Sequence, residues 1–383
     1  MKPTELPGRH QDTLVRRAMR RAELLRYWWE YRGRLRELLR VIDPADRVQL
    51  DGDEKTAVRE YWRQFGVGSV NEDWYRLFKA LTGSVNPRFV PEETFRTRIE
   101  PILCRRDVSA AYHDKNQLDR LLPEVRRPRT ILRNVYGAYA DEHYRPLDRK
   151  AVMSHLADRQ GPHFLKPAIS GTGSGRNVAR IELVPNGFRI GQTLWSLEDI
   201  ERTYVQDFVV QEAVRQHQSL ATWHPASLNT VRVITLRFDE TIRAVAATLR
   251  VGNGSHVDNG HAGGLLCGVN VADGVTTPFA VDVFFRRFDH HPLSEEAFDG
   301  RVVVSFEAIR SLALQVHARL PYFDVLSCDI AVAEDASPCL VEVNTFGQGV
   351  EPHQFLKGAP LFDDATDGVL SLVARRSRSG WNQ

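Results

Sequence analysis

The spacing of apolar residues changes about one hundred positions into the chain. Before that point apolar residues recur three and four positions apart, as in Ala18, Ala22 and Leu25, which is the spacing of an amphipathic helix. The same spacing predicts further helices over residues 58–65 and 74–81. A group of prolines then interrupts the pattern, so we expect a helical region over residues 1–100.

After the prolines, short apolar runs of strand length alternate with helical segments. The predicted strands are Thr130–Leu132, His163–Pro167, Phe208–Gln211, Val231–Phe238, Ile242–Leu249, Leu326–Ala333 and Cys339–Val343. The predicted helices are Leu197–Tyr204 and Phe306–Leu320. This mixture indicates an α+β domain over residues 101–383, with a first part over 101–215 and a second part over 216–383.

Composition narrows the class of protein. The 383 residues include 51 Lys and Arg against 49 Asp and Glu, a net charge of +2, which argues against a dedicated nucleic-acid binder. The four cysteines are scattered and form no CxxC pair, so neither a zinc ribbon nor a disulfide framework is expected. We find no signal peptide and no apolar run of about 20 residues, and we expect a cytoplasmic protein without a membrane span.

The arginine-rich start of the chain has two interpretations. Its first forty residues hold eleven Lys and Arg against five Asp and Glu. The simpler interpretation is a solvated helix face, and the alternative is a surface that docks an acidic or membrane partner.

Three oxygen-bearing side chains lie in two apolar strands near the end of the chain. Asp329 interrupts the first strand, and the second strand carries Glu342 and Asn344. Residues two apart on a strand face the same side, and a hairpin partner brings Asp329 beside them. Carboxylate and amide oxygens suit Mg²⁺, whereas acids in apolar strands are costly unless they are paired or bind a metal. The pattern predicts a metal site, and edge residues facing water are the alternative.

A lysine followed by a glycine-rich loop suggests a site for phosphate. Lys166 ends a predicted strand, and the loop that follows contains Gly171, Gly173, Ser174 and Gly175. Backbone N–H groups of such a loop can approach phosphate oxygens, although a simple hairpin turn explains the loop equally well.

Other polar positions gain meaning only from their order. The strand ending in Gln211, Glu212 and Val214 could hold an adenine edge or could run into a surface loop. Arg232 and Arg250 lie in apolar strands, where a guanidinium pairs with a carboxylate or a phosphate. Structural salt bridges are the alternative for both arginines. Asn259 and His261 lie in a polar, glycine-rich loop, where an imidazole could relay a proton.

Taken in order, these features resemble the ATP-grasp superfamily. The resemblance covers residues 107–372 and includes an Asp-Lys pair ending at Lys115. Within the superfamily, residues 224–232 (HPASLNTVR) and 258–264 (DNGHAGG) resemble the sugar-transfer-associated, α-L-glutamate-ligase-related group. The implied fold has two α+β subdomains that grip ATP, here preceded by the helical region.

The resemblance implies ATP and Mg²⁺ as cofactors and assigns roles to residues of this chain. The implied nucleotide-binding residues are Lys115, Lys166, Gly171, Gly173, Ser174, Gly175, Gln211, Glu212 and Val214. The implied metal ligands are Asp329, Glu342 and Asn344. We assign catalytic roles to Arg232, Arg250, Asn259 and His261.

The expected activity is that of a carboxylate–amine or carboxylate–hydroxyl ligase. It would form an acyl phosphate from a small-molecule carboxylate and transfer the acyl group to an amine or hydroxyl acceptor. The name of the group associates it with cell-surface glycan or natural-product biosynthesis. Two alternatives remain open: a kinase acting on a sugar or another small hydroxyl compound, and a nucleotide-binding module without catalysis.

Overall fold

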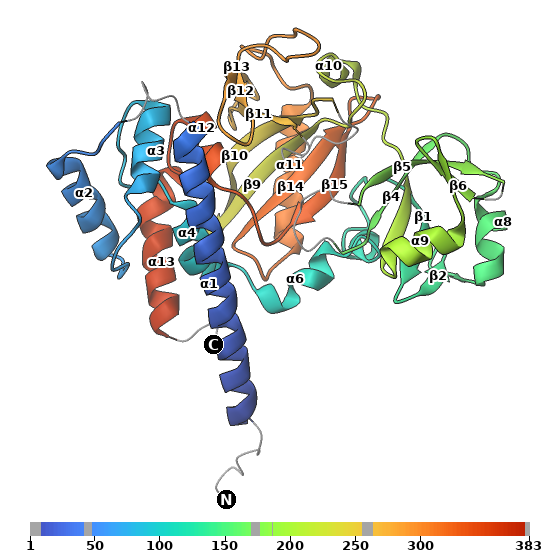
Figure 1. The fold of residues 1–383 in the computed structure, drawn as a ribbon, viewed down its shortest axis with the longest axis horizontal. Helices are drawn as coiled ribbons and strands as arrows, with labels where there is room; N and C mark the ends of the chain where they lie inside the picture. The colour runs from blue at the N-terminus through green and yellow to red at the C-terminus, as the bar shows by residue number, and fades with distance from the viewer. Residues whose placement is uncertain (1–8, 42–47, 170–176, 186, 255–262, 380–383) are drawn as a thin grey trace, which may run out of the picture. The chain divides into compact units, whose positions relative to one another are not determined.

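The computed structural model describes residues 9–41, 48–169, 177–185, 187–254 and 263–379 (Figure 1). The chain divides into two compact units. The first comprises Met1–Arg105 together with Gly349–Gln383, and the second comprises Arg106–Gln348. Residues 349–383 belong to the second part predicted over residues 216–383, whereas in the structure they cluster with the N-terminal helices.

The first unit is helical, as the spacing of its apolar residues predicts. Its N-terminal helices are α1 (Arg9–Val41), α2 (Gly52–Arg63), α3 (Asp73–Thr82), α4 (Glu92–Thr94) and α5 (Glu100–Leu103), with a π-helical turn at Phe95–Ile99. Asp51 begins α2 with a capping box, since its side chain accepts from Glu54 N–H and the Glu54 side chain accepts from Asp51 N–H. Trp62, Trp74 and Phe78 are buried and form the aromatic core.

Specific hydrogen bonds explain why the C-terminal segment belongs to this unit. The segment contains α12 (Glu351–Lys357), a 3-10 turn (Asp363–Ala365) and α13 (Thr366–Arg378). Buried Gln354 bonds both backbone groups of Val90, accepting from its N–H and donating to its carbonyl at 2.8 Å each. Asp367 on α13 accepts from the Tyr61 hydroxyl at 2.7 Å. The spacing of apolar residues in the sequence cannot predict such long-range polar contacts.

The second unit begins with helices α6 (Arg106–His113) and α7 (Leu118–Leu121), followed by an antiparallel sheet. The strand order is β3-β2-β1-β8-β4-β5-β6-β7. The strands are β1 (Thr130–Val135), β2 (Ala138–Ala140), β3 (Pro146–Leu147), β4 (Pro162–Pro167), β5 (Ala179–Val184), β6 (Gly187–Ile190), β7 (Thr193–Trp195) and β8 (Phe208–Glu212). A 3-10 turn (Arg149–Ala151) leads into α8 (Val152–Leu156), and α9 spans Leu197–Tyr204. These helices contribute Val152 and Ile200 to the buried core that covers one face of the sheet.

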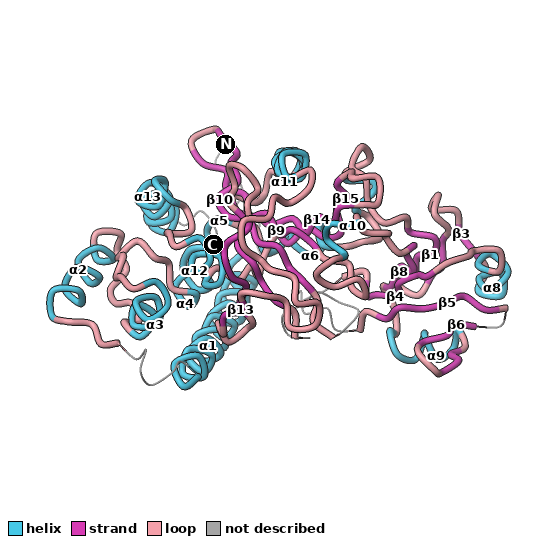
Figure 2. Tube along the Cα trace, turned by 90° about the horizontal axis from the view of Figure 1, so that it is seen from above, coloured by secondary structure: helices cyan, strands magenta, loops and turns pink. Residues whose placement is uncertain are grey.

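A second antiparallel sheet completes this unit. Its strand order is β13-β12-β11-β10-β9-β14-β15, so β15 is an edge strand. The strands are β9 (Thr230–Phe238), β10 (Thr241–Val251), β11 (Leu265–Val269), β12 (Thr276–Val281), β13 (Arg287–Phe288), β14 (Val325–Val332) and β15 (Pro338–Asn344). The helices are α10 (Gln218–Ala221) and α11 (Phe306–Arg319), and Figure 2 shows α11 running beside the sheet.

The α+β architecture with a helical N-terminal region confirms the fold class predicted from the sequence. None of the described helices combines the length and apolar character needed to cross a membrane.

Candidate functional site

A row of charged side chains crosses the second sheet on the face opposite α11. Asp329 on β14 lies directly opposite Glu342 on β15 and Arg232 on β9. Arg232 in turn lies opposite Thr248 of β10, so Arg250, two positions further along, shares the same face. Thr235, an odd number of positions from Arg232, faces the other side and bonds His317 of α11. The strand register therefore produces the row.

Asp329 is the centre of this row. Its carboxylate accepts two hydrogen bonds from Arg232, at 2.7 Å from Nε and 2.7 Å from Nη2, and one from Arg250 Nη1 at 2.6 Å. Burial of Asp329 opposes ionisation, but the two guanidinium charges outweigh it and lower the pKa of the carboxyl to about 2. The carboxylate is thus charged at neutral pH and is shared by two cations.

Glu342 and Asn344 end the row at the sheet edge. Lys115 lies 3.2 Å from Glu342, measured from Nζ to Oε1. The side-chain Nδ2 of Asn344 is buried and makes no hydrogen bond within the described part of the chain. Two carboxylates and one amide on a single sheet face are a donor set that fits Mg²⁺. Asp329 is the least available of the three, since both of its oxygens already accept from arginines.

Lys166 on β4 belongs to the same cluster. Burial and the nearby charge of Lys115 lower the pKa of Lys166 to about 8, and Glu342 partly offsets both effects. The structure therefore brings together Lys115 from the turn between α6 and α7, Lys166 from the first sheet and Glu342 from the second, as expected for a site that neutralises phosphate.

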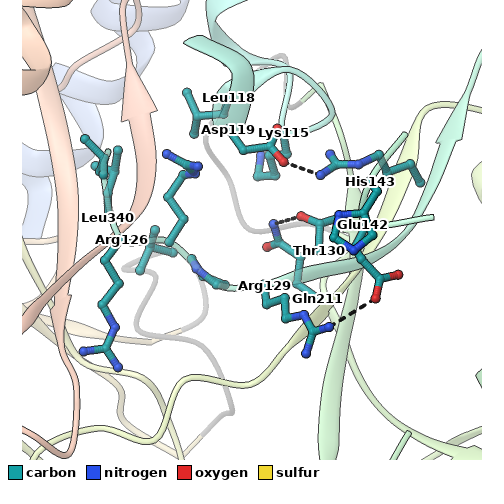
Figure 3. A pocket seen from close by; sticks show the side chains of 15 residues that line it. Lys115, Leu118, Asp119, Arg126, Arg129, Thr130, Glu142, His143, Gln211 and Leu340 are labelled. Carbon is teal, nitrogen blue, oxygen red and sulfur yellow. Dashed lines mark hydrogen bonds and ion pairs between the residues drawn. The ribbon is translucent and has the colours of Figure 1, made fainter. Parts of the chain in front are cut away.

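A cavity of about 370 Å³ lies beside this cluster (Figure 3). Segment 126–130, Lys115, Gln211, Leu340 and Val341 contribute to its wall. The Gln211 side chain donates from Nε2 to the Thr130 hydroxyl at 2.9 Å, and its Oε1 atom is buried without a partner in the described residues. Burying an acceptor without a donor is costly, so this atom is a candidate hydrogen-bond partner for a ligand in the neighbouring cavity.

A second cavity of about 510 Å³ shares residues 126–129 with the first. Glu212 and Val214 line it, together with residues 333–335 and Cys339. The predicted hinge therefore borders both cavities, with Gln211 in one and Glu212 and Val214 in the other.

The segment 126–129 is a site feature that the sequence analysis missed. Its sequence, Arg-Arg-Pro-Arg, directly precedes β1. Arg126 pairs with Asp335 on the β14–β15 turn at 2.7 Å, and its carbonyl accepts from Leu340 N–H on β15 at 2.9 Å. Arg129 pairs with Glu142 at 3.1 Å. The available signal was this arginine cluster next to a predicted strand.

Six predicted site residues lie outside the described residues. They are Gly171, Gly173, Ser174, Gly175, Asn259 and His261. The strands on either side of the first group, β4 and β5, pair antiparallel.

Comparison with known proteins gives one family match. Residues 141–367, more than half of the chain, match the family described as sugar-transfer associated ATP-grasp. No curated protein sequence matches the chain.

Several solved structures are similar to parts of the chain. VanG D-Ala:D-Ser ligase from Enterococcus faecalis is 14% identical, with a TM-score of 0.41 over 70% of this chain and 64% of that one. D-alanine-D-alanine ligase from Coxiella burnetii is 11% identical, with a TM-score of 0.40 over 73% and 62%. L-amino acid ligase from Bacillus licheniformis is 11% identical, with a TM-score of 0.38 over 83% and 61%. The matched parts span less than two thirds of each of those proteins.

Proposed function

The chain belongs to the sugar-transfer associated ATP-grasp family, and from that premise we propose that it is a ligase that activates a carboxylate with ATP. Family membership assigns ATP and Mg²⁺ as its cofactors. The carboxylate and the acceptor are small molecules in this proposal, and the acceptor carries an amine or a hydroxyl. The description of the family favours a role in glycan or related biosynthesis.

One observation carries the proposal: the convergence of Lys115, Lys166 and Glu342. These groups come from different parts of the second unit, and the metal-type donor Asn344 lies two residues from Glu342. Two lysines beside carboxylate and amide oxygens match the needs of a polyphosphate and its divalent cation. Mg²⁺, held by Glu342 and Asn344 with Asp329 behind them, would neutralise charge on the phosphate oxygens.

The proposed reaction has two steps. An oxygen of the substrate carboxylate attacks the γ-phosphorus of ATP, an acyl phosphate forms, and the bond to the ADP oxygen breaks. The amine or hydroxyl then attacks the acyl carbon, the new amide or ester bond forms, and inorganic phosphate leaves. The acceptor also loses a proton, for which His261 is our candidate base.

The chain's own residues contribute mainly position and charge. Lys115 and Lys166 would hold phosphate oxygens, while Arg232 and Arg250 would face the phosphoryl group in transfer. The adenine base of ATP would lie against the hinge at Gln211. There the Oε1 atom, which has no partner in the described residues, can accept a hydrogen bond from the adenine amino group.

The test is calorimetric titration of the full chain with ATP in the presence and absence of Mg²⁺. We expect Mg²⁺-dependent binding that the double variant Glu342→Gln, Asn344→Ala loses. Glu307→Gln is the matched control, because Glu307 is exposed on α11 at the other face of the sheet. A wild-type chain that does not bind ATP, or a double variant that binds as well as the wild type, would contradict the proposal.

Product analysis then separates a ligase from a kinase. With candidate carboxylates and acceptors present, phosphorus NMR should show ADP and inorganic phosphate together with an amide or ester product. Phosphate retained on a stable hydroxyl product would instead show kinase activity.

A further inference from the structure

A buried polar cluster lies where the chain leaves β10, and the proposed reaction does not use it. Its members are His224, Ser227, Asn229 and His291, each at most 6% exposed. The first three belong to the HPASLNTVR segment that ends at Arg232. Buried polar groups of this kind are costly unless fully hydrogen-bonded, so their arrangement calls for a physical explanation.

The hydrogen bonds of this cluster form a chain in which each donor and acceptor can be assigned. His224 Nε2 accepts from Gly254 N–H at 3.3 Å, so in the neutral ring Nδ1 carries the proton. Nδ1 then donates to the Ser227 hydroxyl at 2.8 Å, and that hydroxyl donates to Asn229 Oδ1 at 2.7 Å. The direction of each bond fixes the direction of the next.

Gly252 lies at the centre of these contacts. Its N–H donates to Asn229 Oδ1 at 3.1 Å, and its carbonyl accepts from His291 Nε2 at 2.8 Å. His291 Nδ1 accepts from the backbone N–H groups of Leu293 and Ser294, so Nε2 is the protonated nitrogen. Both polar groups of one peptide position are therefore held by buried side chains.

No other residue fits at position 252 without rearrangement. A Cβ atom there would lie 2.2 Å from the Ser227 hydroxyl oxygen and 2.8 Å from His224 Nδ1. The close approach shows that the side chains of Ser227 and His224 pack directly against the backbone of Gly252.

Gly252 follows Arg250 by two residues and comes directly after the end of β10 at Val251. Arg250 lies opposite Thr230, the residue after Asn229, and donates to Asp329 at 2.6 Å. The cluster therefore fixes the end of β10 that determines where the Arg250 guanidinium lies.

We propose that His224, Ser227, Asn229 and His291 are positioning residues that clamp Gly252 and thereby hold Arg250 toward the terminal phosphate of ATP. This rests on the proposed function, because it assigns Arg250 to the phosphoryl group in transfer. The clamp contains none of the residues assigned to the adenine or to the metal, and it acts through Arg250, so its loss should weaken ATP binding more than ADP binding.

The experiment compares the affinities for Mg²⁺-ATP and Mg²⁺-ADP, measured by calorimetry on the full chain. We expect the wild type to bind ATP at least tenfold more tightly than ADP, and Arg250→Met to remove most of that preference. Ser227→Ala, which removes the central hydroxyl, should reduce the preference at least threefold with ADP affinity unchanged. Ser227→Thr, which restores a hydroxyl, should recover it.

His291→Gln changes the group that donates to the Gly252 carbonyl, and its ATP and ADP affinities provide the test if Ser227→Ala does not fold. His290→Ala is the matched control, because His290 is the exposed neighbour of His291. An unchanged ATP-to-ADP ratio, or equal weakening of both nucleotides, would overturn the clamp. A wild-type chain that binds neither nucleotide would overturn the proposed function itself.

Discussion

Both units of this protein bury ion pairs, but they use them differently. In the helical unit, Arg96 pairs with Glu92 at 2.7 Å and with Glu100 at 3.3 Å, and all three side chains are nearly inaccessible. In the second unit, Asp329 is buried between Arg232 and Arg250. Burial of charge alone does not tell which cluster is functional.

The difference lies in the surroundings, because buried acceptors without a partner in the described residues occur in both units, such as Glu351 Oε2 in the helical unit, whereas Gln211 of the second unit lines a cavity. Glu92 accepts from Arg96 with one oxygen and from Val350 N–H with the other, at 2.6 Å, so its acceptors serve the fold. The row in the second unit continues to Glu342, which Lys115 contacts at 3.2 Å, and Lys115 lines the cavity together with Gln211, whose Oε1 atom has no partner in the described residues. A buried polar atom that lacks a hydrogen-bond partner and lies beside a cavity is therefore a better sign of a binding site than a buried ion pair.

The largest expected effect comes from removing a buried carboxylate from either cluster. Asp329→Ala leaves Arg232 and Arg250 without their shared countercharge and should lower the free energy of unfolding by about 3–5 kcal/mol. It should also abolish Mg²⁺-dependent ATP binding. Urea unfolding and calorimetry measure the two effects.

Glu92→Ala is the matched change in the helical unit. It should destabilise the protein by a similar amount and leave the Mg²⁺-ATP affinity of the folded fraction unchanged. If Glu92→Ala weakened ATP binding as strongly as Asp329→Ala does, the distinction between the two clusters would be wrong.

A buried histidine behind the charged row should affect stability without affecting binding. Burial lowers the pKa of His317 to about 4, against an ordinary value of 6.5, and the ring bonds Thr235 and the Phe323 carbonyl. The neutral ring contributes its full stability above pH 6.5, and this contribution is lost as the pH falls toward 4, by up to about 3 kcal/mol.

His317→Gln should therefore flatten the decline of unfolding free energy between pH 6.5 and 4, measured by urea titration at several pH values. The exposed His290→Gln should keep the wild-type slope. A His317→Gln slope equal to that of the wild type would mean that His317 titrates normally.

The sequence predicts an element well where its local signals agree. Helix α9 has the predicted bounds, since Ser196 and Asp199 form a capping box at its start. Strands β5–β7 are among those not predicted, and they are short and only partly buried, so their apolar alternation is weak. Residues 349–383 belong to the helical unit through polar contacts such as that of Gln354 with Val90. The spacing of apolar residues does not predict contacts of this kind.

Part of the candidate site could also be predicted from the sequence. The hairpin that places Asp329 beside Glu342 follows from two apolar strands and a polar turn. The pairing of Asp329 with Arg250 could not be predicted, because it needs the register of β10, β9 and β14 together. The functional roles of these residues remain predictions.

A more moderate effect is expected at Lys166, where the available charge depends on pH. With a pKa of about 8, the free site loses this positive charge as the pH rises above 8. ATP binding requires the charged form, so the affinity at pH 9 should be roughly tenfold weaker than at pH 7. Lys166→Arg keeps its charge and should remove this dependence in calorimetric titrations, whereas Lys166→Met should bind weakly at both pH values. A wild-type affinity that is constant from pH 7 to 9 would contradict a role for this ammonium group.

The smallest effect should come from the helical unit, at a carboxyl that does not bind a ligand. Burial and the charge of Glu92 raise the pKa of Glu351 well above its ordinary value, so the folded protein holds this group as a neutral acid. Its contribution to stability is complete below the ordinary pKa of a glutamate and is lost as the pH rises through the raised value.

Glu351→Gln cannot ionise, so at alkaline pH its free energy of unfolding should exceed that of the wild type by roughly 1 kcal/mol. Thermal unfolding at pH 7 and 9 measures the difference, with Glu307→Gln as the exposed control. If Glu351→Gln instead changed ATP affinity, buried charge in the helical unit would be coupled to the nucleotide site, and the presence of a cavity beside a buried polar atom would no longer separate the two clusters.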